Sequence, residues 1–124
     1  MTPAELFTQI ASNRGALLRC EGQSVAGREQ ELRALRLTFD LGVVEVKPSG
    51  DALVAETLAA DAPRDRLVSL DEAEPWWKLL GHPLNRVVTG EPVRLVLQWR
   101  ADSDGPKRVE LRAASDVLHV RETP

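Results

Sequence analysis

The side chains that most often do chemistry in proteins are sparse in this 124-residue chain, which contains two histidines and one cysteine. A histidine that works as a catalytic base needs a nearby nucleophile, and a zinc ion needs several His, Cys or carboxylate ligands. His119 lies in an alternating apolar segment, so we expect its imidazole on the exposed face of a strand. His82 stands between Gly81 and Pro83, where an imidazole can bond the free carbonyl groups at a helix end. Neither position predicts a metal site or a catalytic site.

Cys20 is interpreted as a small buried apolar side chain. A catalytic thiol needs surroundings that stabilise its thiolate, and the charged neighbours of Cys20 in the sequence are only Arg19 and Glu21. A lone cysteine also excludes an internal disulfide.

Two sets of carboxylates could do acid–base work or hold a divalent cation. The acidic run at 71–74 has the composition of a helix N-terminus, where acids are favoured by capping and by the helix dipole. Asp51 and Asp116 occupy matching places in two similar segments and could face each other, but aspartates in such places more often stabilise turns. The chain contains no glycine-rich phosphate loop, no G-x-S-x-G and no C-x-x-C. We therefore predict a protein that is not an enzyme and that needs no cofactor and no metal.

The tryptophans are the strongest candidates for recognition. Trp76 and Trp77 are adjacent, so on a helix their side chains point about 100° apart and cannot fill one core pocket. One of them is expected to pack on the sheet face that carries Trp99, and the other to lie near the surface. We predict a possible interaction surface formed by Trp76, Trp77 and His82.

The elements that must position these residues follow from the hydrophobic periodicity. Thr2, Pro3 and Glu5 form a capping box for a first helix, whose apolar face is Leu6, Phe7, Ile10 and Ala11. Residues 17–25 fit a helix or a strand equally well. The period then changes to two, and a second short helix is expected at 71–80 before strand patterns resume after Pro83. Strands are predicted at 35–41, 43–47, 52–57, 93–99, 109–113 and 118–120, with a hairpin loop at 101–106.

The two parts of the chain resemble each other. Four short blocks recur in the same order, which favours an internal duplication. We predict one α+β domain over 1–124, an antiparallel β-sheet built from two similar β-meander halves at about 3–58 and 72–121, each preceded by a helix, with a linker at 59–71. The matched blocks are 22–25 with 81–84, 35–39 with 95–99, 44–46 with 109–111, and 49–55 with 114–120.

The composition limits the kinds of protein and partner that fit this chain. Hydrophobic residues make up 43% and charged residues 28% of the chain, the net charge is −3, and 13 of the 16 basic residues are arginine. This arginine bias is typical of a GC-rich bacterial genome, and the acidic balance argues against nucleic acid as a partner. The N-terminus has no signal-peptide pattern and no stretch is long enough to cross a membrane, so we expect a cytoplasmic protein without membrane partners.

The segment Trp76-Trp77-Lys78-Leu79-Leu80-Gly81-His82-Pro83-Leu84, the strand ending at Trp99 and the Ala114-Ser115 strand resemble a small bacterial domain family of unknown function. Its pattern is W-x-x-L-x-G-x-P-L followed by a hairpin and a terminal strand with A-S. The resemblance covers mainly the second half and implies no activity. The chain departs from the family at 87–92, where the family has an Asn/Gln-Gly-Tyr-Asp stretch.

These observations favour a non-catalytic protein-interaction module. The alternative is a small-ligand binding module with its site between the two halves. The expected partner is another protein or a second copy of this chain, because the short apolar strand at 117–120 would leave an unpaired sheet edge in a monomer.

Overall fold

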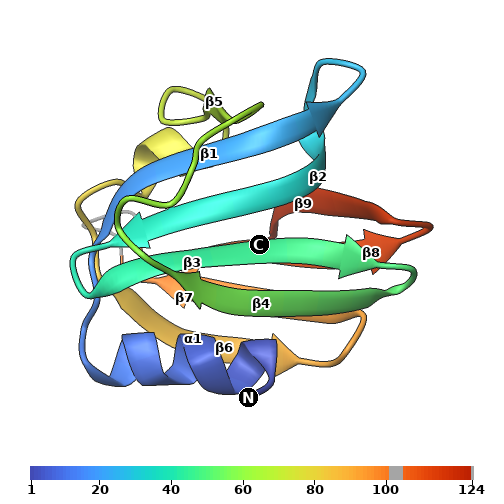
Figure 1. The fold of residues 1–124 in the computed structure, drawn as a ribbon. Helices are drawn as coiled ribbons and strands as arrows, with labels where there is room; N and C mark the ends of the chain where they lie inside the picture. Colours follow the sequence, from blue (N-terminus) through green and yellow to red (C-terminus); the bar gives the residue numbers. More distant parts are fainter. Residues whose placement is uncertain (101–104, 124) are drawn as a thin grey trace.

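The computed structural model describes residues 1–100 and 105–123, so most of the loop predicted at 101–106 lies outside the described residues. The described chain forms one antiparallel sheet of nine strands that curls into a half-barrel (Figure 1). The predicted class, antiparallel α+β, is confirmed at this level. The strands are β1 (Leu17–Val25), β2 (Arg28–Phe39), β3 (Gly42–Ser49), β4 (Ala52–Leu58), β5 (Val68–Ser69), β6 (Leu84–Gly90), β7 (Arg94–Trp99), β8 (Lys107–Ala114) and β9 (Val117–Thr123).

The predicted first helix is confirmed as α1 (Pro3–Ser12). Thr2 caps it by accepting a hydrogen bond from the backbone N–H of Glu5 at 3.1 Å. Its apolar face is buried, and the helix packs against β6 and β4. Since these are end strands of the sheet, α1 lies across the opening of the half-barrel (Figure 1).

The sheet consists of two antiparallel meanders, β1–β4 in front and β6–β9 behind them (Figure 1). They join where Glu31 and Leu32 of β2 pair with β9, before the rest of β2 pairs with β3. On the other side, the backbone N–H of Leu53 in β4 donates to the carbonyl of Pro92, just before β7, at 2.7 Å. The interior between the two meanders is filled by apolar side chains.

Strand register is alike in the two meanders. Leu35 lies opposite Val46 between β2 and β3, and Leu95 lies opposite Leu111 between β7 and β8. Likewise, the turn pair between β3 and β4 is Ser49 with Ala52, and that between β8 and β9 is Ala114 with Val117. Three of the four predicted sequence blocks therefore fall at corresponding places in the two meanders.

The first predicted block is wrong. Gly22 lies opposite Leu35, and the residue opposite Leu95 is Gly90, so Gly22 corresponds to Gly90 rather than to Gly81. A physical reason is that both positions need a glycine. A Cβ on Gly22 would lie 2.8 Å from a Leu70 methyl group, and one on Gly90 would lie 2.5 Å from the Cβ of Ala4.

The second predicted helix is also wrong. Only one 3₁₀ turn forms there, η1 (Trp76–Lys78), and Pro75 before it makes no side-chain cap. Pro75 and Gly81 leave too few residues between them to offset the cost of nucleating an α-helix. The acids at 71–74 therefore serve no α-helix N-terminus. Asp71 instead accepts a hydrogen bond from the backbone N–H of Cys20 at 2.7 Å.

The core contains Leu37, Phe39, Leu97 and Trp99, which are buried. Leu41 continues the alternation of Leu37 and Phe39 in the sequence but is exposed, because it lies in the turn between β2 and β3.

The expected unpaired edge at 117–120 is wrong, because β9 lies between β8 and β2. The order of the strands in the sheet determines which strand lies at an edge, and the sequence pattern does not predict that order. No helix in the described part of the chain is long and apolar enough to span a membrane.

Candidate functional site

The three residues of the predicted interaction surface do not share one surface. Trp76 is fully buried and packs edge to face on Trp99, with ring centroids 6.3 Å apart, so it cannot meet a partner in this state. Trp77 is 53% exposed, and the ammonium group of Lys78 lies 5.8 Å from its ring centroid. The prediction that one tryptophan is core and the other is at the surface is confirmed, and Trp76 is removed from the predicted surface.

His82 is half-buried, and its backbone holds the chain in place just before β6. Its N–H donates to the carbonyl of Leu79 at 3.0 Å, and its carbonyl accepts from the N–H of Leu17 at 3.1 Å. A reciprocal hydrogen bond joins the same two segments, since the N–H of Leu84 donates to the carbonyl of Gly15 at 2.8 Å. These bonds join the start of β1 to the start of β6.

Cys20 is buried, as predicted. Burial raises the pKa of its thiol well above the ordinary value, and the nearby carboxylates of Asp71 and Glu21 raise it further. A thiol in this state is a poor nucleophile.

Asp51 and Asp116 cap each other's turns. The carboxylate of Asp51 accepts from the backbone N–H of Ser115 at 2.8 Å, and the carboxylate of Asp116 accepts from the N–H of Gly50. The favoured prediction, a local turn role for each aspartate, is therefore wrong, because each carboxylate binds the turn of the opposite meander and the two aspartates lie across from each other. One oxygen of each carboxylate accepts a backbone hydrogen bond, and these two bonds tie the turns of the two meanders together.

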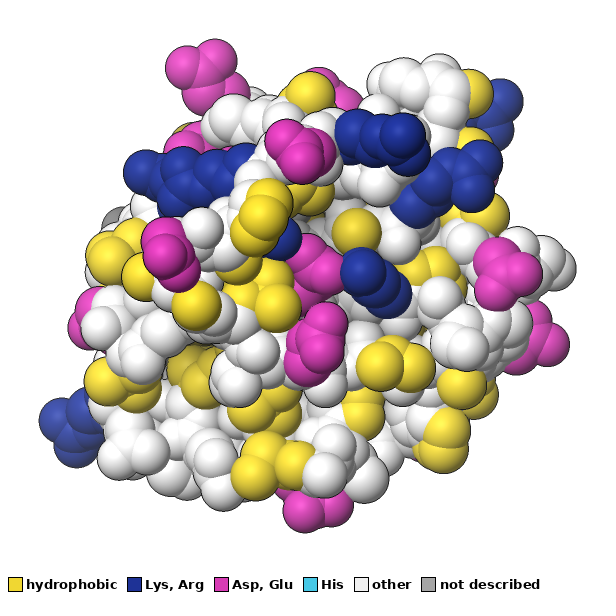
Figure 2. Space-filling model, viewed as in Figure 1, with side chains coloured by type: hydrophobic (Ala, Val, Ile, Leu, Met, Phe, Trp, Pro, Cys, Tyr) yellow, Lys and Arg dark blue, Asp and Glu magenta, His cyan; other side chains and the backbone are white. Residues whose placement is uncertain are grey.

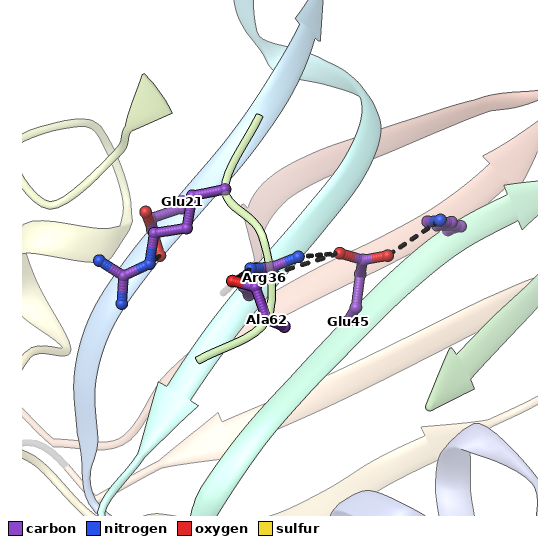
Figure 3. Close-up of polar contacts among 6 residues, drawn as sticks. Glu21, Arg36, Glu45 and Ala62 are labelled. Atoms are coloured by element: carbon purple, nitrogen blue, oxygen red, sulfur yellow. Dashed lines mark hydrogen bonds and ion pairs between the residues drawn. The ribbon is translucent and has the colours of Figure 1, made fainter. Parts of the chain in front are cut away.

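A cluster of buried charges lies on the outer face of the front meander. In Figure 2, most Lys and Arg side chains of this face gather in its upper half. The guanidinium of Arg36 donates twice to one oxygen of Glu45, at 2.9 and 3.3 Å, and Lys47 contacts the other oxygen at 3.0 Å (Figure 3). Burial alone would raise the pKa of Glu45, but the hydrogen bonds from Lys47 and Arg36 outweigh it and lower that pKa.

This cluster fastens the linker to the sheet. Arg36 also donates to the carbonyl of Ala62 at 3.4 Å, and the segment that carries Ala62 crosses the outer side of the strands (Figure 3). Glu21, opposite Arg36 on β1, lies 3.7 Å from Arg64 of the same segment. The cluster joins three basic side chains to two carboxylates, and the Glu21 oxygen nearest Arg64 is buried and accepts no hydrogen bond.

A larger depression lies on the outer side of the sheet where the two meanders meet. We call it the β2–β9 groove, and its volume is about 860 Å³. Its wall is the hairpin between β1 and β2, and its floor is the outer face of β8 and β9. The groove is lined by Gly27, Arg28, Glu29, Gln30, Glu31, Glu110, Arg112, Ala114, His119, Val120 and Arg121.

Most charges in the groove form ion pairs. Glu31 contacts Arg28 at 2.7 Å and the imidazole of His119 at 4.0 Å. The buried carboxylate of Glu110 contacts Arg121 at 3.0 Å and also binds Arg94. Burial would raise the pKa of Glu110, but the hydrogen bond from Arg94 and the charge of Arg121 lower it.

Two opposite charges in the groove remain unpaired. Among the described residues, Arg112 on the floor and Glu29 on the wall take part in no hydrogen bond or ion pair, and both are exposed. Arg112 also borders a second hollow of about 580 Å³ that reaches Asp51 and Val93. Its guanidinium therefore stands between two depressions, available to a ligand.

Sequence reasoning missed this groove. It placed His119 correctly on the outer face, where it lies opposite Arg112, but did not combine the two. The available signal was the alternation of polar residues at 110, 112, 119 and 121 in two strands joined by a tight turn. The wall could not be inferred, because residues 28–31 reach β9 through a pairing between distant parts of the chain.

Searches against protein families, curated proteins and solved structures find no match for this chain. Within the described residues, no group of three or more His, Cys, Asp or Glu side chains is placed to hold a metal ion.

Proposed function

We propose that this chain is a non-catalytic protein-interaction module that binds its partner through the β2–β9 groove. The observation that carries the proposal is the pair of unpaired opposite charges, Arg112 and Glu29, in an open groove lined by both halves. Exposed charges of opposite sign in one groove suit a protein partner, because complementary charges orient a partner and exclude wrong ones.

The alternative is a small-ligand binding module with the same site, since the groove lies between the two halves. Its volume falls in the range of small-molecule pockets. Such pockets hold few charged side chains, however, whereas six of the eleven residues that line the groove are Arg or Glu. The lining therefore favours a polypeptide partner.

We also infer that the halves arose by duplication, now with Gly22 matched to Gly90. The shared register, the reciprocal turn caps of Asp51 and Asp116, and the reciprocal bonds between the starts of β1 and β6 support a pseudo-twofold relation. An experimental structure in which residues 17–58 and 84–123 differ in register would contradict it.

The residues of the β2–β9 groove do not follow this pseudo-twofold relation. Its wall is the long β1–β2 hairpin, whose strands have 9 and 12 residues, whereas the corresponding strands β6 and β7 have 7 and 6. On the floor, Arg112 and His119 stand where the first meander has Lys47 and Val54. A feature present on one side of a duplicated fold is the expected place for a specialised function.

The groove, rather than the tryptophan segment, is the proposed contact surface, with Trp77 as a secondary candidate. A homodimer has no support from an unpaired β9 edge, because β9 lies between β2 and β8. The proposal retains a cytoplasmic location and the resemblance to the small bacterial family, which adds no activity.

Affinity capture tests the proposal. Tagged wild-type protein, the charge reversal R112E and the matched control R86E would be incubated with native bacterial lysate and the bound proteins quantified by mass spectrometry. Arg86 is exposed on β6 outside the groove. We expect a protein retained by wild type and R86E and lost with R112E. Equal retention by all three would refute the groove as the contact surface.

A further inference from the structure

We infer that the partner segment seated in the β2–β9 groove carries both signs of charge, with one carboxylate for Arg112 and one basic side chain for Glu29. This inference rests on the proposed function and names the chemistry of its partner.

Most charged side chains of the groove already have a partner within the chain. Glu110 is bound by two arginines and Glu31 by Arg28, so a basic group that bound either acid would have to displace an internal partner. An acidic group at Arg28 or Arg121 would face the same competition. Within the part of the chain that the structure describes, two charged groups of the groove therefore remain without a partner, the guanidinium of Arg112 on its floor and the carboxylate of Glu29 on its wall.

Net charge leads to the same conclusion. The lining contains Arg28, Arg112 and Arg121 against Glu29, Glu31 and Glu110, which is three charges of each sign. A strongly acidic or strongly basic segment would therefore gain little from the groove as a whole and would meet like charge at one of its sides. A segment with one charge of each sign meets opposite charge at both.

Titrations with short capped peptides test the inference. Three sets of glycine–serine peptides would carry one glutamate and one lysine at varied spacing, two glutamates, or two lysines. Binding would be followed by NMR shifts of the backbone amides of residues 27–31 and 110–121. Each exposed ion pair is expected to lower Kd by roughly two- to fivefold, so the best mixed peptide should bind more tightly than either single-sign set.

Matched variants separate the two contacts. R112Q should remove the advantage of the mixed peptide over the two-lysine set, E29Q should remove its advantage over the two-glutamate set, and R86Q should change neither. Equal binding by all three sets, or no saturable shift in the groove, would overturn the inference. If the capture experiment still depends on Arg112 in that case, only this inference fails, whereas loss of that dependence refutes the proposed function too.

Discussion

Replacing Arg36 by methionine should destabilise the fold by about 3 kcal/mol. The Arg36 side chain is 9% exposed and Glu45 is 8% exposed, so the substitution leaves a carboxylate buried without its main partner. Removing one member of a buried ion pair costs about 3–5 kcal/mol. The lower end applies because Lys47 still contacts the second oxygen of Glu45.

The double variant R36M/E45L separates the cost of the orphaned charge from the worth of the pair. Replacing a whole buried pair by apolar residues of similar size is often neutral, so the double variant should lie within about 1 kcal/mol of wild type. K47M is the matched control and should cost less than about 1 kcal/mol, since Lys47 is 54% exposed.

Urea unfolding followed by circular dichroism measures these differences, provided that the slope m is unchanged. The reasoning is refuted if R36M costs less than about 1 kcal/mol, because the pair would then not be buried as described. It is refuted equally if the double variant is as unstable as R36M.

Further predictions concern the core, the glycines and acid stability. W99A should cost about 3–5 kcal/mol in thermal or urea unfolding, whereas W77A should stay within about 0.5 kcal/mol; equal costs would contradict their placement. G90A should cost about 1–3 kcal/mol by overpacking against α1, and unchanged stability would show that the helix lies elsewhere. The folded-state pKa values of Glu45 and Glu110 are lowered, so their stabilisation is present above pH about 4.5 and is lost as the pH falls through the folded values. The E45Q/E110Q variant should therefore lose less Tm on acidification than wild type, and parallel Tm curves would contradict these shifts.

Local patterns predict most of the individual elements. The capping box at Thr2 defines α1, and period-two alternation identifies the strands that carry Phe39 and Trp99. These signals are local because helix caps and alternating burial depend on residues close in sequence. The ambiguity at 17–25 was resolved as strand β1, which gains its partners from β2 and from the linker.

The errors lie where distant segments decide the structure. Residues 71–80 carry helix signals but give only one 3₁₀ turn, because Asp71 binds β1 and Trp76 is drawn into the core beside Trp99. The predicted alignment of the two halves is wrong in its first strand, since Gly22 matches Gly90 by register, which no short block of sequence reveals. The groove is not predictable from the sequence for the same reason, because its wall and floor meet through the pairing of β2 with β9.

Hydrogen–deuterium exchange on the complex with the captured partner tests the central claim most directly. If the β2–β9 groove is the contact surface, partner binding will slow exchange of backbone amides at 27–31 and 110–121, and exchange at 76–82 will not change. Slower exchange at 76–82 around the exposed Trp77, with the groove unaffected, would contradict this account and assign recognition to the tryptophan segment.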